Sequence, residues 1–254
     1  MNKIVRQFGF YVALIGLWQI VAMLKIWKPY LFPTPWNVVE ALRAGFADHT
    51  FWTGMAVSMK RMLIGYLLSC VMGIVLGIVL AQSRFLAETL GRLVVSIQSL
   101  PSVCWLPVAI QWFGLTEKAI IFVVVIGSLL AVAIAVETGL RNVPRIYLMA
   151  GRNLGATRVD LLLHVFLPAS LPHLMAGLKQ GWAFAWRSLI TGEMIFVSLG
   201  LGQLLTTGRD LNDINQVVAV MLLIVTIGAL ADGLLFRSVE RIIEKKWGLA
   251  TTNA

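Results

Sequence analysis

Long apolar runs alternate with short polar and basic segments along the whole chain. Six of these runs approach the ~20 residues that an α-helix needs to cross a bilayer. They cover residues 8–24, 62–81, 93–115, 119–136, 171–196 and 217–236. The pattern predicts an all-α membrane protein with six transmembrane helices, built as a single transmembrane domain over residues 1–254.

The first long connecting segment, residues 31–50, has a pattern of its own. It begins with a stretch broken by Pro33 and Pro35 and continues with mildly amphipathic spacing. We expect this segment to lie along the outer membrane interface rather than to cross the membrane.

The second connecting segment is a polar, basic island at residues 137–170. Pro144 suits the first turn of a helix that runs to about Asn153. Gly155 then interrupts the helix, and Thr157 can cap a second short helix through Leu163. Several of its residues are too apolar for a free loop and require a partner surface or packing on the chain's own helix ends: Tyr147, Leu148, Leu154, Val159, Leu162 and Leu163.

Composition agrees with a membrane protein, because 59% of the residues are hydrophobic, 13% are charged and the mean hydropathy is +0.84. The net charge of +9 comes from basic residues between the apolar runs, which favours a positive-inside pattern over nucleic-acid binding. With the N-terminus inside, twelve Lys and Arg residues face the cytoplasm and seven face outward. Both termini, the island and the basic end at 237–254 are therefore expected in the cytoplasm.

Cysteine and histidine chemistry is not indicated. Cys70 and Cys104 lie in apolar segments and are interpreted as small packing residues rather than a disulfide. No Cys/His cluster has the spacing of metal ligands, so no metal site is expected.

The second predicted helix carries a small residue at every fourth position. These residues are Gly65, Ser69, Gly73, Gly77 and Ala81. Such a ridge allows another helix backbone to approach closely. It can serve packing inside the subunit or a contact between two copies of the chain.

The third predicted helix contains Pro101 and Pro107, which remove backbone donors and bend a helix. The freed carbonyls require burial in protein or a wet cavity. Ser99, Ser102 and Gln111 supply nearby polar groups. Both a kinked packing helix and a helix along a substrate path fit this pattern.

The fifth predicted helix places Lys179, Arg187 and Glu193 within the membrane, where ionisable groups are costly and should face protein or water. Arg187 could contact an anionic substrate, since its planar guanidinium matches sulfonate, nitrate or carboxylate oxygens. Alternatively, it forms a structural ion pair with Glu193; Asp232 lies too near the inner end to be its partner.

The island also resembles the cytoplasmic "EAA" loop of permease subunits in binding-protein-dependent ABC importers. Ala150, Gly155, Leu167 and Pro168 match that pattern, whereas Met149 stands where the family usually has an acid and Gly151 where a second Ala is common. The resemblance implies a coupling helix that docks on an ATPase. The implied docking residues are Met149, Ala150, Gly151, Leu154, Gly155, Ala156, Thr157 and Arg158.

The likeness extends over roughly residues 30–248. Residues 98–107 with Trp112-Phe113-Gly114 are similar to the third-helix signature of the nitrate, sulfonate and taurine branch. So are Gly192-Glu193-Met194, the turn at 200–202, and Asp232 followed by Arg237 and Arg241.

This resemblance implies the type I ABC importer permease fold in a bacterial inner membrane. It implies a homodimer, two copies of an ATPase, and a periplasmic or lipid-anchored substrate-binding protein. ATP and Mg would be bound by the ATPase, since this chain has no Gly-x-x-x-x-Gly-Lys-Ser/Thr loop, and no cofactor is expected on the chain itself. The chain would therefore be a transport subunit and not an enzyme.

The expected solute is a small anion such as an aliphatic sulfonate, taurine or nitrate. The residues expected along its path are Ser99, Pro101, Ser102, Trp105, Gln111, Arg187 and Glu193. The alternative is a secondary carrier or channel that works without ATP. Such a carrier would more often show inverted repeats and has no need for a docking loop.

Overall fold

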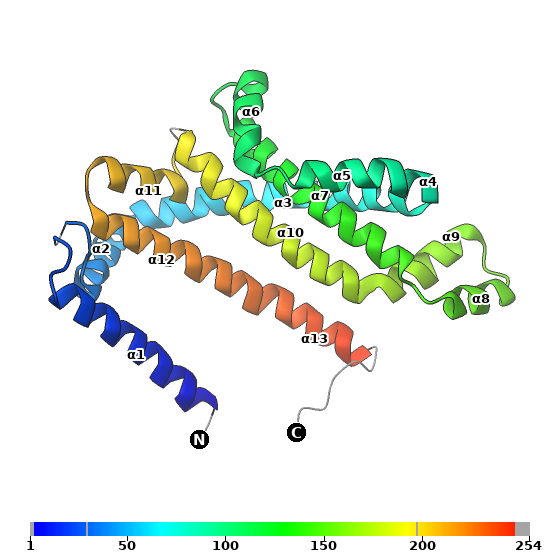
Figure 1. Cartoon of the computed structure of the whole chain (residues 1–254), viewed down its shortest axis with the longest axis horizontal. Helices are drawn as coiled ribbons and strands as arrows, with labels where there is room; N and C mark the ends of the chain where they lie inside the picture. Colours follow the sequence, from blue (N-terminus) through cyan, green and yellow to red (C-terminus); the bar gives the residue numbers. More distant parts are fainter. Residues whose placement is uncertain (1–2, 29, 197, 247–254) are drawn as a thin grey trace. The chain divides into compact units, whose positions relative to one another are not determined.

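The computed structural model describes residues 3–28, 30–196 and 198–246, and no strand occurs in this part of the chain (Figure 1). The chain divides into two compact units. The first comprises Met1–Ser58 and Glu193–Thr226, and the second comprises Met59–Gly192 and Ile227–Ala254. Three long helices contribute residues to both: α3 (Thr50–Ala81), α10 (Leu167–Ile195) and α12 (Ile214–Leu230).

The remaining elements belong to one unit each. The first unit holds α1 (Lys3–Met23), α2 (Pro35–Ala47) and α11 (Leu201–Asp210). The second holds α4 (Arg84–Leu86), the π-helical turn η1 (Ala87–Gly91), α5 (Arg92–Gln98), the 3₁₀ turn η2 (Ser102–Trp105), α6 (Leu106–Phe113), α7 (Glu117–Arg141), α8 (Arg145–Asn153), α9 (Arg158–Asp160), the π-helical turns η3 (Leu161–Phe166) and η4 (Ala231–Phe236), and α13 (Arg237–Lys246).

Length and composition identify four apolar helices able to cross a membrane among the described residues: Val5–Met23, Thr50–Ala81, Glu117–Arg141 and Ile214–Arg241. The bent pair Arg84–Gln98 and Ser102–Phe113 is a fifth candidate span. α10 corresponds to the fifth predicted segment, residues 171–196. It has 29 residues, enough to cross, but carries four ionisable side chains, those of His173, Lys179, Arg187 and Glu193, and is not among the apolar spans.

One predicted helix is wrong in detail. Residues 93–115 do not form a continuous helix, because two helical pieces meet there at 95°. The break lies at Pro101, whose backbone is extended (φ −55°, ψ 139°) and which has no amide hydrogen to donate. Pro107 bends nothing, because it sits in the first turn of α6, where the missing donor has no helical partner to lose.

The second span also begins earlier than predicted, at Thr50 rather than residue 62. In the sequence, the basic pair Lys60-Arg61 interrupts the apolar residues and therefore marks the predicted start of the span at residue 62. In the structure Arg61 is 3% exposed and its guanidinium lies 2.9 Å from the Glu117 carboxylate. A paired cation is tolerated inside a helix where an isolated one is not.

The small-residue ridge of α3 packs on α7 within the subunit. A Cβ at Gly65 would lie 2.6 Å from Val124, and one at Gly73 would lie 2.8 Å from the Leu129 carbonyl oxygen. Residue numbers rise together along both helices, so α3 and α7 run parallel. The ridge therefore serves intrasubunit packing, the first of the two alternatives for it.

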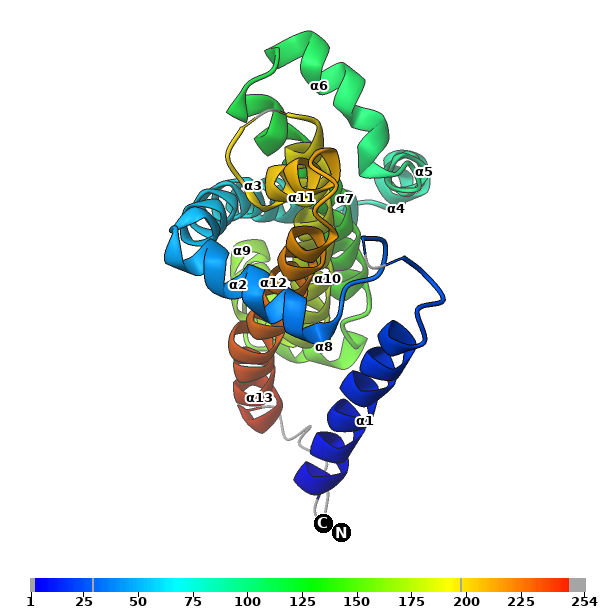
Figure 2. The same ribbon diagram turned by 90° about the vertical axis from the view of Figure 1, so that its left-hand side faces the viewer.

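α7 is the central helix of the second unit, and 61% of its span is buried. Its C-terminal half forms a core with side chains of α3, η3 and α10. The ribbons of α7 and α10 lie next to each other in both views (Figure 1, Figure 2). The core residues are Val132, Val136 and Leu140, packed against Ile74, Ile78, Ala81, Phe166, Leu167, Leu174 and Leu178.

The amphipathic segment after the first helix folds into a helix, α2. Thr34 caps it by accepting the amide of Asn37 at 3.3 Å, and Pro35 occupies its first turn.

Candidate functional sites: a pocket at a broken helix and an exposed apolar loop

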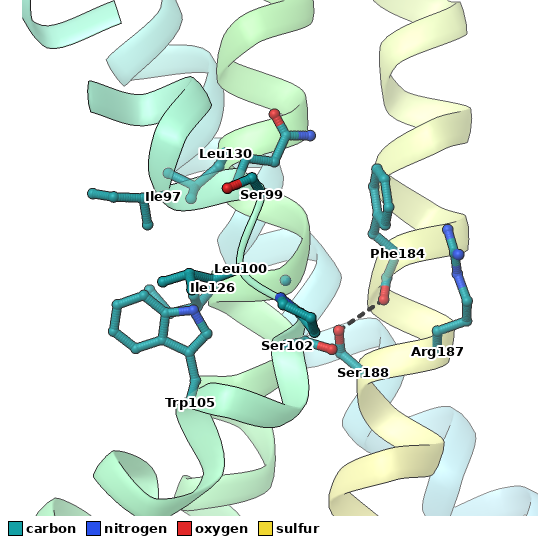
Figure 3. A pocket seen from close by; sticks show the side chains of 13 residues that line it. Ile97, Ser99, Leu100, Ser102, Trp105, Ile126, Leu130, Phe184, Arg187 and Ser188 are labelled. Carbon is teal, nitrogen blue, oxygen red and sulfur yellow. Dashed lines mark hydrogen bonds between the residues drawn. The ribbon is translucent and has the colours of Figure 1, made fainter. Parts of the chain in front are cut away.

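A pocket of about 300 Å³ lies in the second unit where the third span breaks (Figure 3). The break between α5 and η2 forms one wall, and α7 and α10 form the others. The lining residues are Ile97, Gln98, Ser99, Leu100, Pro101, Ser102, Trp105, Ile126, Gly127, Leu130, Phe184, Arg187 and Ser188. Non-helical backbone at membrane depth is tolerated where it lines such a cavity.

Close packing behind the pocket holds the break in place. A side chain at Gly127 of α7 would overlap the Ser188 hydroxyl and would lie 3.6 Å from Ser102 Cβ. Only glycine therefore lets α10 and the broken segment meet over α7. Ser102 and Ser188 point toward each other in Figure 3.

Hydroxyl groups and one guanidinium give the pocket its polarity. The Ser188 hydroxyl donates to the Phe184 carbonyl at 2.8 Å, and the Ser99 hydroxyl donates to the Ser96 carbonyl at 2.7 Å. Each oxygen keeps lone pairs that can accept a further hydrogen bond. Arg187 is the charged residue among those that line the pocket.

Arg187 is exposed and only lightly held. Its Nε donates to the Ala183 carbonyl at 3.2 Å, and its guanidinium lies 4.7 Å from the centre of the Phe184 ring. No carboxylate of the described residues forms an ion pair with it. The predicted alternative of a structural pair with Glu193 is therefore not what the structure shows.

Five of the seven residues predicted along the path line this one pocket: Ser99, Pro101, Ser102, Trp105 and Arg187. The other two do not. Gln111 is exposed on α6, beyond the bend. Glu193 is fully buried in the first unit.

Sequence reasoning missed Phe184, Ser188 and Gly127. Phe184 and Ser188 are one helical turn apart and flank Arg187, so the helical period could have indicated them. Gly127 carries a weaker signal, a glycine inside an apolar helix.

Glu193 closes a buried hydrogen-bond network of the first unit. Its carboxylate accepts the Ser58 hydroxyl at 2.7 and 2.9 Å and the Gly202 amide at 3.1 Å. The Ser58 oxygen accepts the Leu201 amide at 2.8 Å. The carboxylate thus caps the N-terminus of α11, where the helix dipole favours a negative charge.

Lys179 joins α10 to the end of the last span. Its ammonium lies 2.8 Å from the Asp232 carboxylate and 3.7 Å from that of Glu240, and Arg237 lies 3.7 Å from Asp232. Asp232 and Arg237 belong to the last part of the family signature in the sequence. In the structure the Asp232 carboxylate pairs with both Lys179 and Arg237.

The polar island folds as two short helices at a glycine hinge. α8 ends at Asn153 as predicted, and Gly155 takes a left-handed conformation (φ 79°). Thr157 and Asp160 form a reciprocal cap: the Thr157 amide donates to Asp160 at 3.1 Å, and the Asp160 amide donates to the Thr157 hydroxyl at 3.2 Å. The second helix does not stop at Leu163, because it continues through η3 into α10.

The same cap fixes the charge of Asp160. The Thr157 hydroxyl and then its amide, both donating to the carboxylate, hold the pKa of Asp160 below its usual value. A lowered pKa in the folded state means that this stabilisation is complete at neutral pH and is lost as the pH falls through the lowered value.

Gly151 explains a departure from the family pattern. It is buried in α8, and a Cβ there would lie 2.8 Å from Leu161 and 3.2 Å from Val165 of η3. Glycine lets α8 lie directly against η3, whereas an alanine there would require the Leu161 side chain to shift.

The outer face of the island is apolar and exposed. Leu154 at the hinge is 88% exposed. Ile146, Tyr147, Met149, Val159 and Leu163 are each at least half exposed. The side chain of Arg158 lies outside the described residues.

Comparison with known proteins shows the family of the chain. Residues 73–247 match the family described as binding-protein-dependent transport system inner membrane component. The taurine transport system permease protein of Escherichia coli (strain K12) is 28% identical over 236 residues, covering 91% of this chain and 86% of the relative. The nitrate import permease protein of Leptolyngbya laminosa is 25% identical over 247 residues, covering 95% and 88%.

Solved structures support the fold. An inward-facing structure of the MetNI methionine ABC transporter matches with a TM-score of 0.65 at 22% identity, covering 76% of this chain and 96% of that one. The chain belongs to the binding-protein-dependent inner membrane components and is the transmembrane translocation subunit of an ABC importer, whose ATPase is a separate subunit.

Proposed function

We propose that this subunit carries a small anion, with an aliphatic sulfonate or taurine as the first candidates and nitrate as the next. The solute would pass the pocket at the broken third span. Two copies of the chain would enclose the path, with two ATPase subunits on one side of the membrane and a substrate-binding protein on the other.

One observation carries the proposal: the pocket combines hydroxyls with a single exposed guanidinium that no described carboxylate neutralises. A planar guanidinium can bind two oxygens of a sulfonate or nitrate side by side. The relatives named for taurine and nitrate import carry solutes of this chemistry.

The island at 137–170 would dock on the ATPase. Its exposed apolar side chains are best explained by burial against a partner, and the cap at Thr157 and Asp160 keeps the second helix in shape. Met149, which replaces the usual acid, is 57% exposed on α8 and would make an apolar contact where relatives make a charged one. Both termini and this island would then be cytoplasmic.

The test is uptake by proteoliposomes that contain the chain, its ATPase and its binding protein. Arg187→Gln should slow uptake of taurine or ethanesulfonate roughly 10- to 100-fold, because one charge-assisted hydrogen-bond pair is lost. Arg187→Lys should recover part of the rate, since it keeps the charge and loses the two-pronged geometry. Uptake is measured with radiolabelled solute.

The matched control is Arg209→Gln, which removes an exposed arginine of α11 that lies 2.9 Å from Asp210. It should leave uptake unchanged. The melting temperature of the assembled complex should change little in either variant, because the Arg187 side chain contacts only its own helix. Normal sulfonate uptake by Arg187→Gln would reject the anion path.

A further inference from the structure

A second pocket, of about 410 Å³, lies in the second unit at the other end of α5. The end of α3, the π-helical turn η1, the start of α5 and the last turns of α7 enclose it. Its lining residues are Leu80, Ala87, Gly91, Arg92, Val95, Ser96, Ile134 and Glu137. The translocation pocket described above shares none of them.

The lining changes character with depth along two antiparallel helices. On α5, Arg92 is the first residue and Val95 lies about 4.5 Å further into the span. On α7, Glu137 lies in the penultimate turn and Ile134 is about 4.5 Å deeper. Both helices thus place a charge at the membrane surface and an apolar side chain directly below it. This order matches an amphiphile standing in the bilayer, not a small ion that would be surrounded by polar groups.

The charges of the pocket are not balanced. Glu137 is bound by Arg141 at 3.1 Å, so its charge is already compensated. Arg92 is exposed on the pocket wall and forms no ion pair with any described carboxylate. A cation at the headgroup level, above an apolar wall, complements a lipid phosphate.

We propose that this pocket binds an anionic phospholipid such as phosphatidylglycerol. Arg92 holds the phosphate, and the upper acyl chain lies along Val95 and Ile134. Val95 is 54% exposed, so the pocket is open to lipid from the side. The site is independent of the solute proposed for the importer.

The experiment is a lipid titration of the delipidated full-length chain in complex with its ATPase, read by native mass spectrometry. Phosphatidylglycerol should bind roughly tenfold more tightly than phosphatidylcholine, and Arg92→Gln should remove that preference because a charge-assisted bond is lost. Arg84→Gln, which changes an exposed arginine of α4 outside the lining, should preserve it.

A second pair of variants tests the space rather than the charge. A Cβ at Gly91 would meet no atom closer than 3.9 Å, and Gly91 lines the pocket, so Gly91→Leu should place its side chain in the space proposed for the lipid and displace it. Gly233→Leu is the control, since Gly233 lies in another π-helical turn with nothing within 4 Å of its Cβ position.

Three results would overturn the proposal: unchanged phosphatidylglycerol binding in Gly91→Leu, an equal loss in Arg84→Gln, or equally tight competition by sn-glycerol 3-phosphate. The last would show a site for a free phosphate ester. A melting curve recorded without lipid identifies a variant that fails to fold. If Gly91→Leu fails in this way, Arg92→Gln still tests the site, because it alters an exposed side chain.

Discussion

At the scale of single residues, Glu193 joins α3 to the start of α11 through buried hydrogen bonds of the first unit. It is fully buried, as is Ser58, and a buried carboxylate is costly unless donors surround it. Ser58 and the amide of Gly202 supply such donors. Gly200 leaves the space for this arrangement, since a Cβ there would lie 2.5 Å from the carboxyl carbon of Glu193.

Gly200→Ala should therefore destabilise the protein by about 1–3 kcal/mol, because an added methyl group must push the carboxylate off its donors. Thermal unfolding of the purified complex should show the loss as a lower Tm. Gly16→Ala is the matched control, because nothing lies within 4 Å of that position on α1. A Tm equal to that of the parent in Gly200→Ala would mean that the turn has room to spare.

The sequence could not reveal this network. Ser58 and Glu193 are 135 residues apart, and a helical period cannot connect them. The sequence shows Glu193 as a charged residue in an apolar helix, and it was therefore predicted to lie along the solute path. The same pattern singled out Arg187, which lines one pocket with Ser99 and Ser102, two residues noted from the local pattern of the third predicted helix. Trp105 lines that pocket too, and it was included because of the family resemblance.

At the scale of elements, proline position decides where a helix breaks. From the sequence, both Pro101 and Pro107 were predicted to bend the helix. In the structure only Pro101 lies at the break, whereas Pro107 lies in the first turn of α6. α8 was predicted to its last residue, because a proline, a glycine and a capping threonine are strictly local signals. The continuous helical path from α9 through η3 into α10 was not predicted. It is stabilised by contacts with Gly151 and with the core around α7, which are distant in sequence.

The exposed face of this loop gives a prediction for docking. Leu154→Asp should weaken binding of the ATPase at least roughly tenfold, because burying a leucine contributes about 1.5–3 kcal/mol and an aspartate would have to be desolvated instead. Leu211→Asp, which alters another exposed leucine at the end of α11, should bind normally. Co-purification of tagged ATPase with each variant measures the difference.

If Leu154→Asp retained the ATPase at the parental level, the apolar face would have to pack against another surface. Membrane insertion of both variants should be normal, since neither leucine is buried in the structure.

At the scale of the whole molecule, the chain is a multi-pass membrane protein, and the distribution of its basic residues predicts its orientation in the membrane. Arg152 on α8 and Arg209 on α11 are both exposed and are expected on opposite sides. Single cysteines, Arg152→Cys and Arg209→Cys, should be placed in a chain that lacks Cys70 and Cys104.

An impermeant thiol reagent added outside intact cells should label only Arg209→Cys. Detergent lysis should then expose both sites, which controls for reactivity. Labelling of Arg152→Cys in intact cells would reverse the proposed orientation and move the docking loop out of reach of a cytoplasmic ATPase.

The π-helical turn η3 has a consequence for how this chain tolerates changes in length. A π turn closes its hydrogen bond one residue later than an α turn, so η3 stores one residue more than a regular helix would need. Deleting one residue within Leu161–Phe166 would remove that surplus, so a regular α-helix could form there without changing the number of helical turns between α9 and α10. The chain can therefore lose one residue at η3 while α8 and its exposed neighbour Leu154 keep their direction, whereas a deletion in the regular part of α10 would rotate them.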